Sequence, residues 1–129
     1  MQAVLNYLSN DSVIQSEIDD NIYFVERPPE DEVVIDNYIV YKVKPISGGF
    51  VKQYALEFNI IGNDLPKLTR VNKRLIELFD DPRNEKIIKD ENITVTSSHL
   101  TSGGGTSRNN ETGNFVIVTY FSIKIKGVF

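Results

Sequence analysis

Few residues of this chain have the types and spacing that catalysis or metal binding requires. His99 is the only histidine, and there is no cysteine. Because histidine-rich and thiolate metal sites both need several such ligands, neither kind of site is expected. A single histidine also needs positioned partners before it can act as an acid or a base. We therefore do not expect His99 to be catalytic.

The glycine run Gly103–Gly105 has the composition of a phosphate-binding loop but not its context. A Walker motif requires Gly-Lys-Ser/Thr followed by a helix. Here Thr106, Ser107 and Arg108 follow the glycines, and a strand is expected next. The G-x-G-x-x-G spacing is also missing. We expect no bound nucleotide and no other cofactor.

Adjacent carboxylates occur at Asp19-Asp20 and at Asp80-Asp81. Glycosidase chemistry needs two carboxyl groups that face each other across a cleft, one of them with a raised pKa. Neighbouring positions at the exposed ends of helices predict neither property. With no activated nucleophile, base or metal site in view, we expect a protein that is not an enzyme.

Length and composition predict one globular domain over residues 1–129. The chain is 40% hydrophobic and 25% charged, in the normal range for a soluble protein. Its apolar runs are far shorter than the ~20 residues of a membrane span. The first nine residues lack the basic start of a signal peptide, so we expect a cytoplasmic protein that does not contact membranes.

Charge is distributed unevenly along the chain. Residues 1–36 carry nine acidic side chains and one basic one, whereas residues 37–129 carry nine acidic and thirteen basic ones. Such polarity suits head-to-tail contact between identical subunits, although an ordinary solvated surface would also explain it. Within the expected loop 26–36, next to Pro28-Pro29, we single out Glu30, Asp31 and Glu32 as a candidate acidic interaction loop.

Hydrophobic periodicity predicts an α+β domain, in which a mostly antiparallel sheet is covered on one face by a main helix. The expected helices are Ala3–Leu8, Ser12–Ile18 and Leu65–Phe79. The expected strands are Ile22–Val25, Tyr38–Lys44, Phe50–Ile61, Ile93–Leu100 and Phe115–Ile125. A turn is expected at Pro45–Gly49, and a short charged connection at Asn84–Asp90.

The segment Ser102–Asn114 separates the last two strands and holds no large apolar residue. It cannot bury enough surface to offset the entropy of ordering, so we expect a long flexible hairpin loop that orders against a partner. The candidate interaction residues of this loop are Ser102, Gly103, Gly104, Gly105, Thr106, Ser107, Arg108, Asn109, Asn110 and Gly113.

The order of these elements resembles the tail-completion proteins of long-tailed bacteriophages, the tail-terminator or head–tail joining family. The resemblance covers nearly the whole chain but includes no signature motif. It rests on the two short N-terminal helices, Ile22-Tyr23, Pro28-Pro29, Tyr38–Tyr41, the Ser47–Gly49 turn, Tyr54–Ile61, a helix of the Asn72–Phe79 kind and a closing Phe-rich strand.

This resemblance implies a virion protein that assembles in the host cytoplasm as a ring, usually of six subunits. Such a ring ends polymerisation of the tail tube and joins the tail to the head, so its partners are the tail-tube protein and a head-closure protein. Sequence-independent contact with DNA in the ring lumen, using Arg108, is a further expectation. The alternatives are a head-closure or minor tail protein, or a small binding module whose loop captures a peptide or small ligand.

The basic side chains lie on an expected helix and on expected strands: Lys67, Arg70, Lys73 and Arg74, and Lys42, Lys44, Lys52, Lys124 and Lys126. The isoelectric point of about 5.0 argues against sequence-specific DNA binding.

Overall fold

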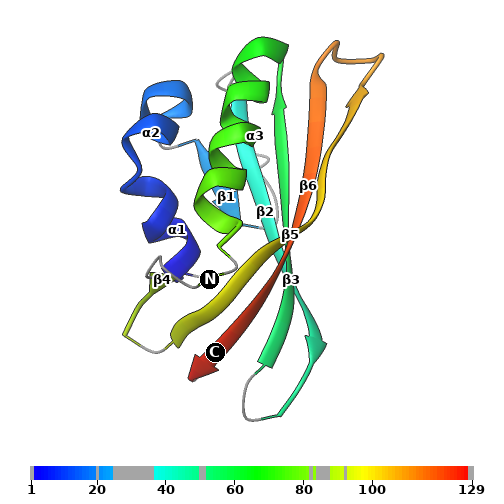
Figure 1. Ribbon diagram of the computed structural model, residues 1–129. Coiled ribbons are helices and arrows are strands. Elements are labelled where there is room, and N and C mark those ends of the chain that lie inside the picture. The colour runs from blue at the N-terminus through cyan, green and yellow to red at the C-terminus, as the bar shows by residue number, and fades with distance from the viewer. Residues whose placement is uncertain are drawn as a thin grey trace.

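The computed structural model describes residues 2–19, 21–24, 37–49, 52–81, 83, 88–91 and 93–127. This part of the chain forms three helices and one six-stranded sheet, which confirms the α+β fold (Figure 1). The helices are α1 (Gln2–Ser9), α2 (Ser12–Ile18) and α3 (Leu65–Phe79). The strands are β1 (Ile22–Phe24), β2 (Asn37–Ser47), β3 (Lys52–Gly62), β4 (Ile88–Lys89), β5 (Ile93–Arg108) and β6 (Phe115–Gly127).

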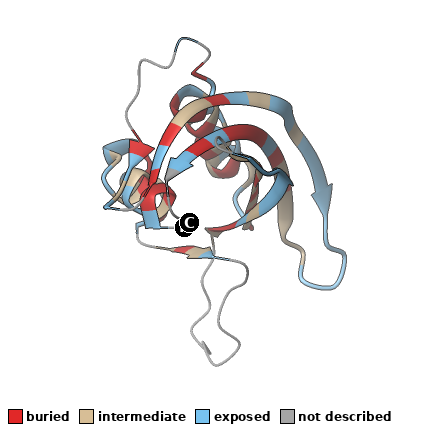
Figure 2. Ribbon diagram, turned by 90° about the horizontal axis from the view of Figure 1, so that it is seen from below, coloured by how far each residue is buried: buried red, intermediate tan, exposed pale blue. Residues whose placement is uncertain are grey.

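The strand order across the sheet is β1-β2-β3-β6-β5-β4. All neighbouring pairs are antiparallel except β1 and β2, which run parallel. The sheet is strongly curved, as Figure 2 shows, and the three helices lie on one side of it. The hairpins β2–β3 and β5–β6 point toward opposite ends of the molecule.

Side chains of the two central strands alternate between the two faces of the sheet, as the sequence predicts. In β3, Tyr54, Leu56, Phe58 and Ile60 are buried, and the residues between them are only partly buried. In β6, every second residue from Ile117 to Ile125 is buried. This pattern is typical of a sheet with one face on the core and one face toward solvent.

Helix α3 covers the buried face through the apolar stripe that its sequence predicts. Leu68, Val71, Leu75, Leu78 and Phe79 are buried. The ring of Phe79 lies 5.2 Å from that of Phe58 and 5.6 Å from that of Phe121, centroid to centroid. Full burial of one such side chain stabilises a fold by roughly 1.5–3 kcal/mol, so this aromatic cluster anchors the helix to the centre of the sheet.

Ion pairs join helix α2 and its N-cap to helix α3. Asp11 caps α2 by accepting a hydrogen bond from the Ile14 amide at 3.0 Å, and Arg74 donates to the same carboxylate at 2.6 Å. Arg70 pairs with Glu17 at 3.1 Å. Two basic residues of the main helix are therefore already neutralised by acidic residues of the N-terminal segment. The charge polarity seen in the sequence is partly cancelled inside the fold.

Two connections differ from the sequence-based expectation. The first part of the expected turn at Pro45–Gly49 is strand instead. Strand β2 continues to Ser47, past a bulge between Pro45 and Ser47. Pro45 lacks an amide donor, and it lies near the end of β2 beyond the residues Ile39–Tyr41 that pair with β1 in the described part of the chain. The expected connection Asn84–Asp90 contains the short strand β4, since Ile88 is buried against β5.

The Asp11–Arg74 pair predicts an acid-sensitive contribution to stability. Arg74 lowers the pKa of Asp11 below its usual 3.8. The stabilisation is therefore present above pH 3.8 and is lost as the pH falls through the lower, folded-state pKa. Asp11→Asn keeps a capping side chain but removes the charge, so we expect it to lower the free energy of unfolding by about 1–3 kcal/mol at neutral pH.

Denaturant unfolding at neutral pH and below pH 3.8 measures this difference, which should shrink in acid. The control is Glu77→Gln, which removes the exposed partner of Arg74 and should cost about 0–0.5 kcal/mol. An equal cost of Asp11→Asn at both pH values would contradict the assignment.

Candidate functional site

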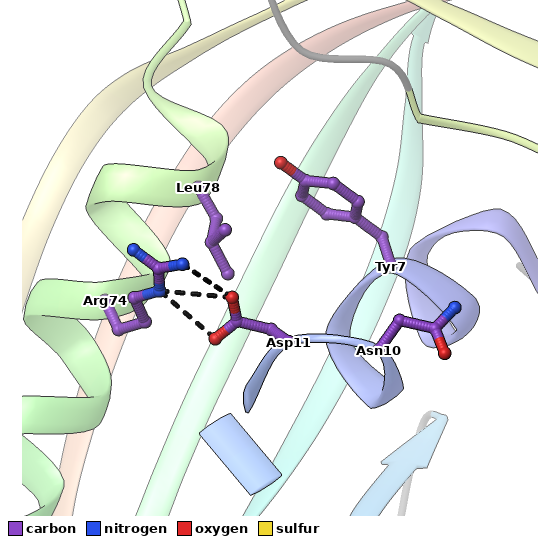
Figure 3. Close-up of a pocket in the computed structure, with 5 residues that line it drawn as sticks. All are labelled: Tyr7, Asn10, Asp11, Arg74 and Leu78. Atoms are coloured by element: carbon purple, nitrogen blue, oxygen red, sulfur yellow. Dashed lines mark hydrogen bonds and ion pairs between the residues drawn. The ribbon is translucent and has the colours of Figure 1, made fainter. Parts of the chain in front are cut away.

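A pocket of about 360 Å³ opens between the N-terminal helices and α3 (Figure 3). It is lined by Tyr7, Asn10, Asp11, Arg74 and Leu78. The guanidinium group of Arg74 points to Asp11 and also donates to Glu77 at 3.0 Å. Burial and the charges of Asp81 and Asp11 raise the pKa of Tyr7, which keeps its hydroxyl protonated at neutral pH. The charged groups of this pocket therefore bind one another and leave no unpaired charge for a ligand.

The other described side chains that were considered for catalysis or metal binding do not form a site either. His99 is exposed on β5. Among the described residues, no cluster of three or more histidine, aspartate or glutamate side chains could hold a metal ion. None of the described helices has the length and apolarity to cross a membrane. The Asp80 carboxylate accepts a hydrogen bond from the Leu100 amide, and the backbone amide of Asp81 donates to the Ser98 carbonyl. The two residues therefore fasten the end of α3 to β5, and Asp81 is buried there rather than exposed as expected.

The segment Ser102–Asn114 is not the long flexible loop that its composition predicts. Strand β5 continues through Arg108, which lies opposite Phe115 of β6. Main-chain pairing with β6, rather than buried side chains, orders this part of the chain. The composition of the segment carries no information about that pairing, so the prediction of a flexible loop was wrong. The sequence contained one signal of this. The expected strand Phe115–Ile125 is longer than Ile93–Leu100, so its first residues needed another partner.

Two glycines of the run are explained by packing. The strand is bulged between Leu100 and Ser102 and again between Gly103 and Gly105. Gly104 lies at the second bulge with a φ of 96°, a conformation that residues with a side chain rarely adopt. A Cβ atom at Gly104 would lie 2.9 Å from Asn72 Nδ2, and one at Gly103 would lie 3.2 Å from Leu100 Cδ2. Gly104 therefore lets β5 pass close beneath α3, and Gly103 leaves room for the Leu100 side chain.

The tip of the hairpin is a compact turn rather than an open loop. The Asn109 amide donates to the Asn114 carbonyl at 2.8 Å, and the Gly113 amide donates to the Asn109 carbonyl at 2.8 Å. The side-chain oxygen of Asn109 accepts from the Glu111 amide at 2.9 Å. Gly113 has a φ of 75°, which suits a glycine that closes such a turn.

Beyond Leu100, β5 forms an exposed edge of the described sheet. Strand β4 pairs only with Thr94 and Val95, so the outer side of Ser102–Arg108 has no strand beside it among the described residues. Since Asn109 is hydrogen-bonded to Asn114, the alternation of an antiparallel ladder turns the amides of Thr106 and Arg108 away from β6. The guanidinium of Arg108 lies 5.5 Å from the ring centre of Phe115.

The candidate interaction residues thus form one continuous surface at the end of the β5–β6 hairpin. All of them are exposed except Gly104 and Gly113, which are partly buried. The sequence suggested these residues as interaction candidates, a prediction that stays untested, but did not show that they form a strand edge, whose outward amides and carbonyls can pair with another chain. The acidic candidates Glu30, Asp31 and Glu32 lie outside the described residues.

Comparison with solved structures shows which proteins share the fold of this chain. No protein-family model matches the chain, and no curated protein matches it in sequence. A chain from the virion of a native gene transfer agent particle has a TM-score of 0.73 with 11% identity, over 98% of this chain and 93% of that one. A second solved chain, which carries no functional name, has a TM-score of 0.63 with 10% identity, over 99% and 91%. The protein therefore shares its fold with a component of a virion particle.

The bulge at Gly104 predicts a position-specific requirement for glycine. Gly104→Ala introduces a Cβ against Asn72 and strains the backbone, so we expect the free energy of unfolding to fall by about 1–3 kcal/mol. The matched control is Gly105→Ala, because nothing lies within 4 Å of that Cβ and no positive φ is required there. It should change stability by less than about 1 kcal/mol. Denaturant unfolding of both variants measures the difference, and equal effects would contradict the packing role of Gly104.

Proposed function

We propose that this protein is a virion structural protein of the tail-terminator kind. In this proposal it forms a ring, of six subunits by the family resemblance, at the head-proximal end of a tail. The ring stops tail-tube polymerisation and contacts a head-closure protein. The protein acts in the virion after assembly in the host cytoplasm.

The observation that carries the proposal is the fold shared with a virion chain over almost the full length of both chains. The order of helices and strands independently resembles the tail-completion family. The chemistry of the described residues points the same way, because Arg70 and Arg74 pair with carboxylates of the N-terminal segment and no cluster that could hold a metal ion is found among these residues. These features favour a role in assembly over a role in catalysis.

The exposed β5 edge and hairpin tip supply a surface for such assembly. A head-to-tail ring joins two different surfaces of the same chain, and an unpaired strand edge offers main-chain donors and acceptors for one of them. We propose that the candidate residues from Ser102 to Gly113 make this contact or bind the tail-tube or head-closure protein. Within the same class, a head-closure or minor tail protein would use the same fold. A binding module that captures a peptide on this edge is the candidate from another class.

Assembly tests the proposed function directly. We expect the purified chain to form rings, alone or with its tail-tube protein, in light scattering and electron microscopy. We also expect particles that lack the protein to carry tail tubes of uncontrolled length without heads. Tubes of normal length in its absence would reject tail termination, and failure to attach heads alone would favour a head-closure role.

Replacing the hairpin tip tests the site separately from the fold. Asn109 and Asn114 form a hydrogen-bonded pair, which suits a two-residue turn, so residues 110–113 can be replaced by Asn-Gly. We expect the melting temperature to stay within a few degrees, because a change of about 1 kcal/mol moves it by only roughly 2–8 °C. Ring formation or partner binding should weaken at least tenfold. Unchanged association would show that the tip is not part of the interface.

A further inference from the structure

The outward face of the three middle strands collects lysines that are far apart in the sequence. On β2, Lys42 and Lys44 lie on the face opposite the buried Tyr41. On β6, Lys124 and Lys126 lie on the face opposite the buried Ile123 and Ile125. All four are exposed, and two lysines on one strand are about 7 Å apart along it. We call these four residues the sheet lysines.

The sheet lysines are opposed by one acidic side chain within β2, β3 and β6. That residue is Glu57, which lies beside Lys42 at 3.9 Å and also accepts a hydrogen bond from Asn59 at 2.6 Å. Four lysines and one glutamate give this face a formal charge of +3, whereas the whole chain has a formal charge of −4. The face is therefore a basic surface on an acidic protein.

On the opposite side of the molecule, two of the four basic residues of α3 are held in ion pairs. On α3, Arg74 is held by Asp11 and Glu77, and Arg70 is held by Glu17. By contrast, Lys44 and Lys124 have no ion pair to any described acidic group. Lys44 and Lys124 therefore supply the charge of this face that no described acidic group neutralises.

The side chains around the sheet lysines suit a phosphate backbone better than a protein surface. Gln53, Ser97 and His99 lie in the same rows of the sheet. Among the exposed large apolar residues of the described chain, Tyr120 lies on this face, and Ile46 lies at the bulge that ends β2. A protein interface normally has an apolar or aromatic core from which lysine is depleted. Phosphate contacts come instead from lysine and from hydroxyl and amide side chains.

From this arrangement we infer that the outward face of β2, β3 and β6 binds the phosphodiester backbone of double-stranded DNA without reading its sequence, through Lys42, Lys44, Lys124 and Lys126. The choice of DNA over other nucleic acids rests on the proposed virion function. The binding surface itself does not depend on ring formation.

Fluorescence anisotropy of the purified chain with a labelled duplex of arbitrary sequence tests the inference. We expect a dissociation constant of about 10⁻⁴–10⁻⁶ M at physiological salt and tighter binding at low salt. Four phosphate contacts predict a slope of about −3.6 in log affinity against log salt, which is a loss on the order of 100-fold between about 50 and 200 mM. A duplex of different sequence should bind equally well.

Three variants locate the surface. Lys44→Glu with Lys124→Glu should weaken binding at least tenfold and reduce the salt slope by about 2. Lys67→Glu with Lys73→Glu changes the net charge equally on the α3 side and should leave affinity within about twofold. Glu57→Gln removes the acid of this face and should strengthen binding several-fold, a gain that loss of folding cannot produce.

Equal losses in the two double variants, no gain in Glu57→Gln or no binding at low salt would each overturn the inference. The inference would also be overturned if polyglutamate displaced the labelled duplex at a lower concentration of negative charge than unlabelled DNA does. That result would identify an acidic protein as the preferred partner. Since these measurements require neither rings nor tails, their failure leaves the proposed function standing. Failure of the tail-length test likewise leaves DNA binding intact.

Discussion

The fold depends on the packing of helix α3 against the middle of the curved sheet. Phe79 at the end of the helix meets Phe58 of β3 and Phe121 of β6, with ring centroids 5.2–5.8 Å apart. These strands are adjacent, so one helix fixes the two central strands at once. Helices shorter than about 12 residues are marginal alone in water. Helices α1 and α2 therefore depend on this layer, against which Tyr7 and Asp11 hold them.

The same contact determines the course of β5. For the strand to pass beneath α3, its backbone must approach Asn72 closely, and glycine permits this at position 104. Asn72 is itself bound to the buried Thr119 hydroxyl, so the side chain cannot move away without leaving a buried polar group unpaired. The glycine run has the composition of a loop, but it is part of β5 and its role is in packing. The exposed edge of β5 lies beyond it.

Charged side chains are arranged differently on the helical side and on the strand side of the molecule. On the helical side, carboxylates of the N-terminal segment lie within hydrogen-bond distance of the arginines of α3, and the charges cancel. On the strand side, the pleat sends every second residue outward, and β2 and β6 lie on either side of β3. Lysines from distant parts of the chain gather there against Glu57. A chain with an acidic net charge therefore has a basic surface on one face of its sheet.

The sequence alone determined the elements whose apolar period is regular, namely the alternating strand with Tyr54–Ile60 and the stripe of Leu65–Phe79. Periodicity succeeds there because burial on one face is a local property of the chain. Only the tertiary structure decided the state of Ser102–Arg108, the pairing of Arg70 and Arg74, and the sharing of one face by Lys44 and Lys124. Each of these depends on a partner that is distant in sequence, and neither composition nor spacing contains that information.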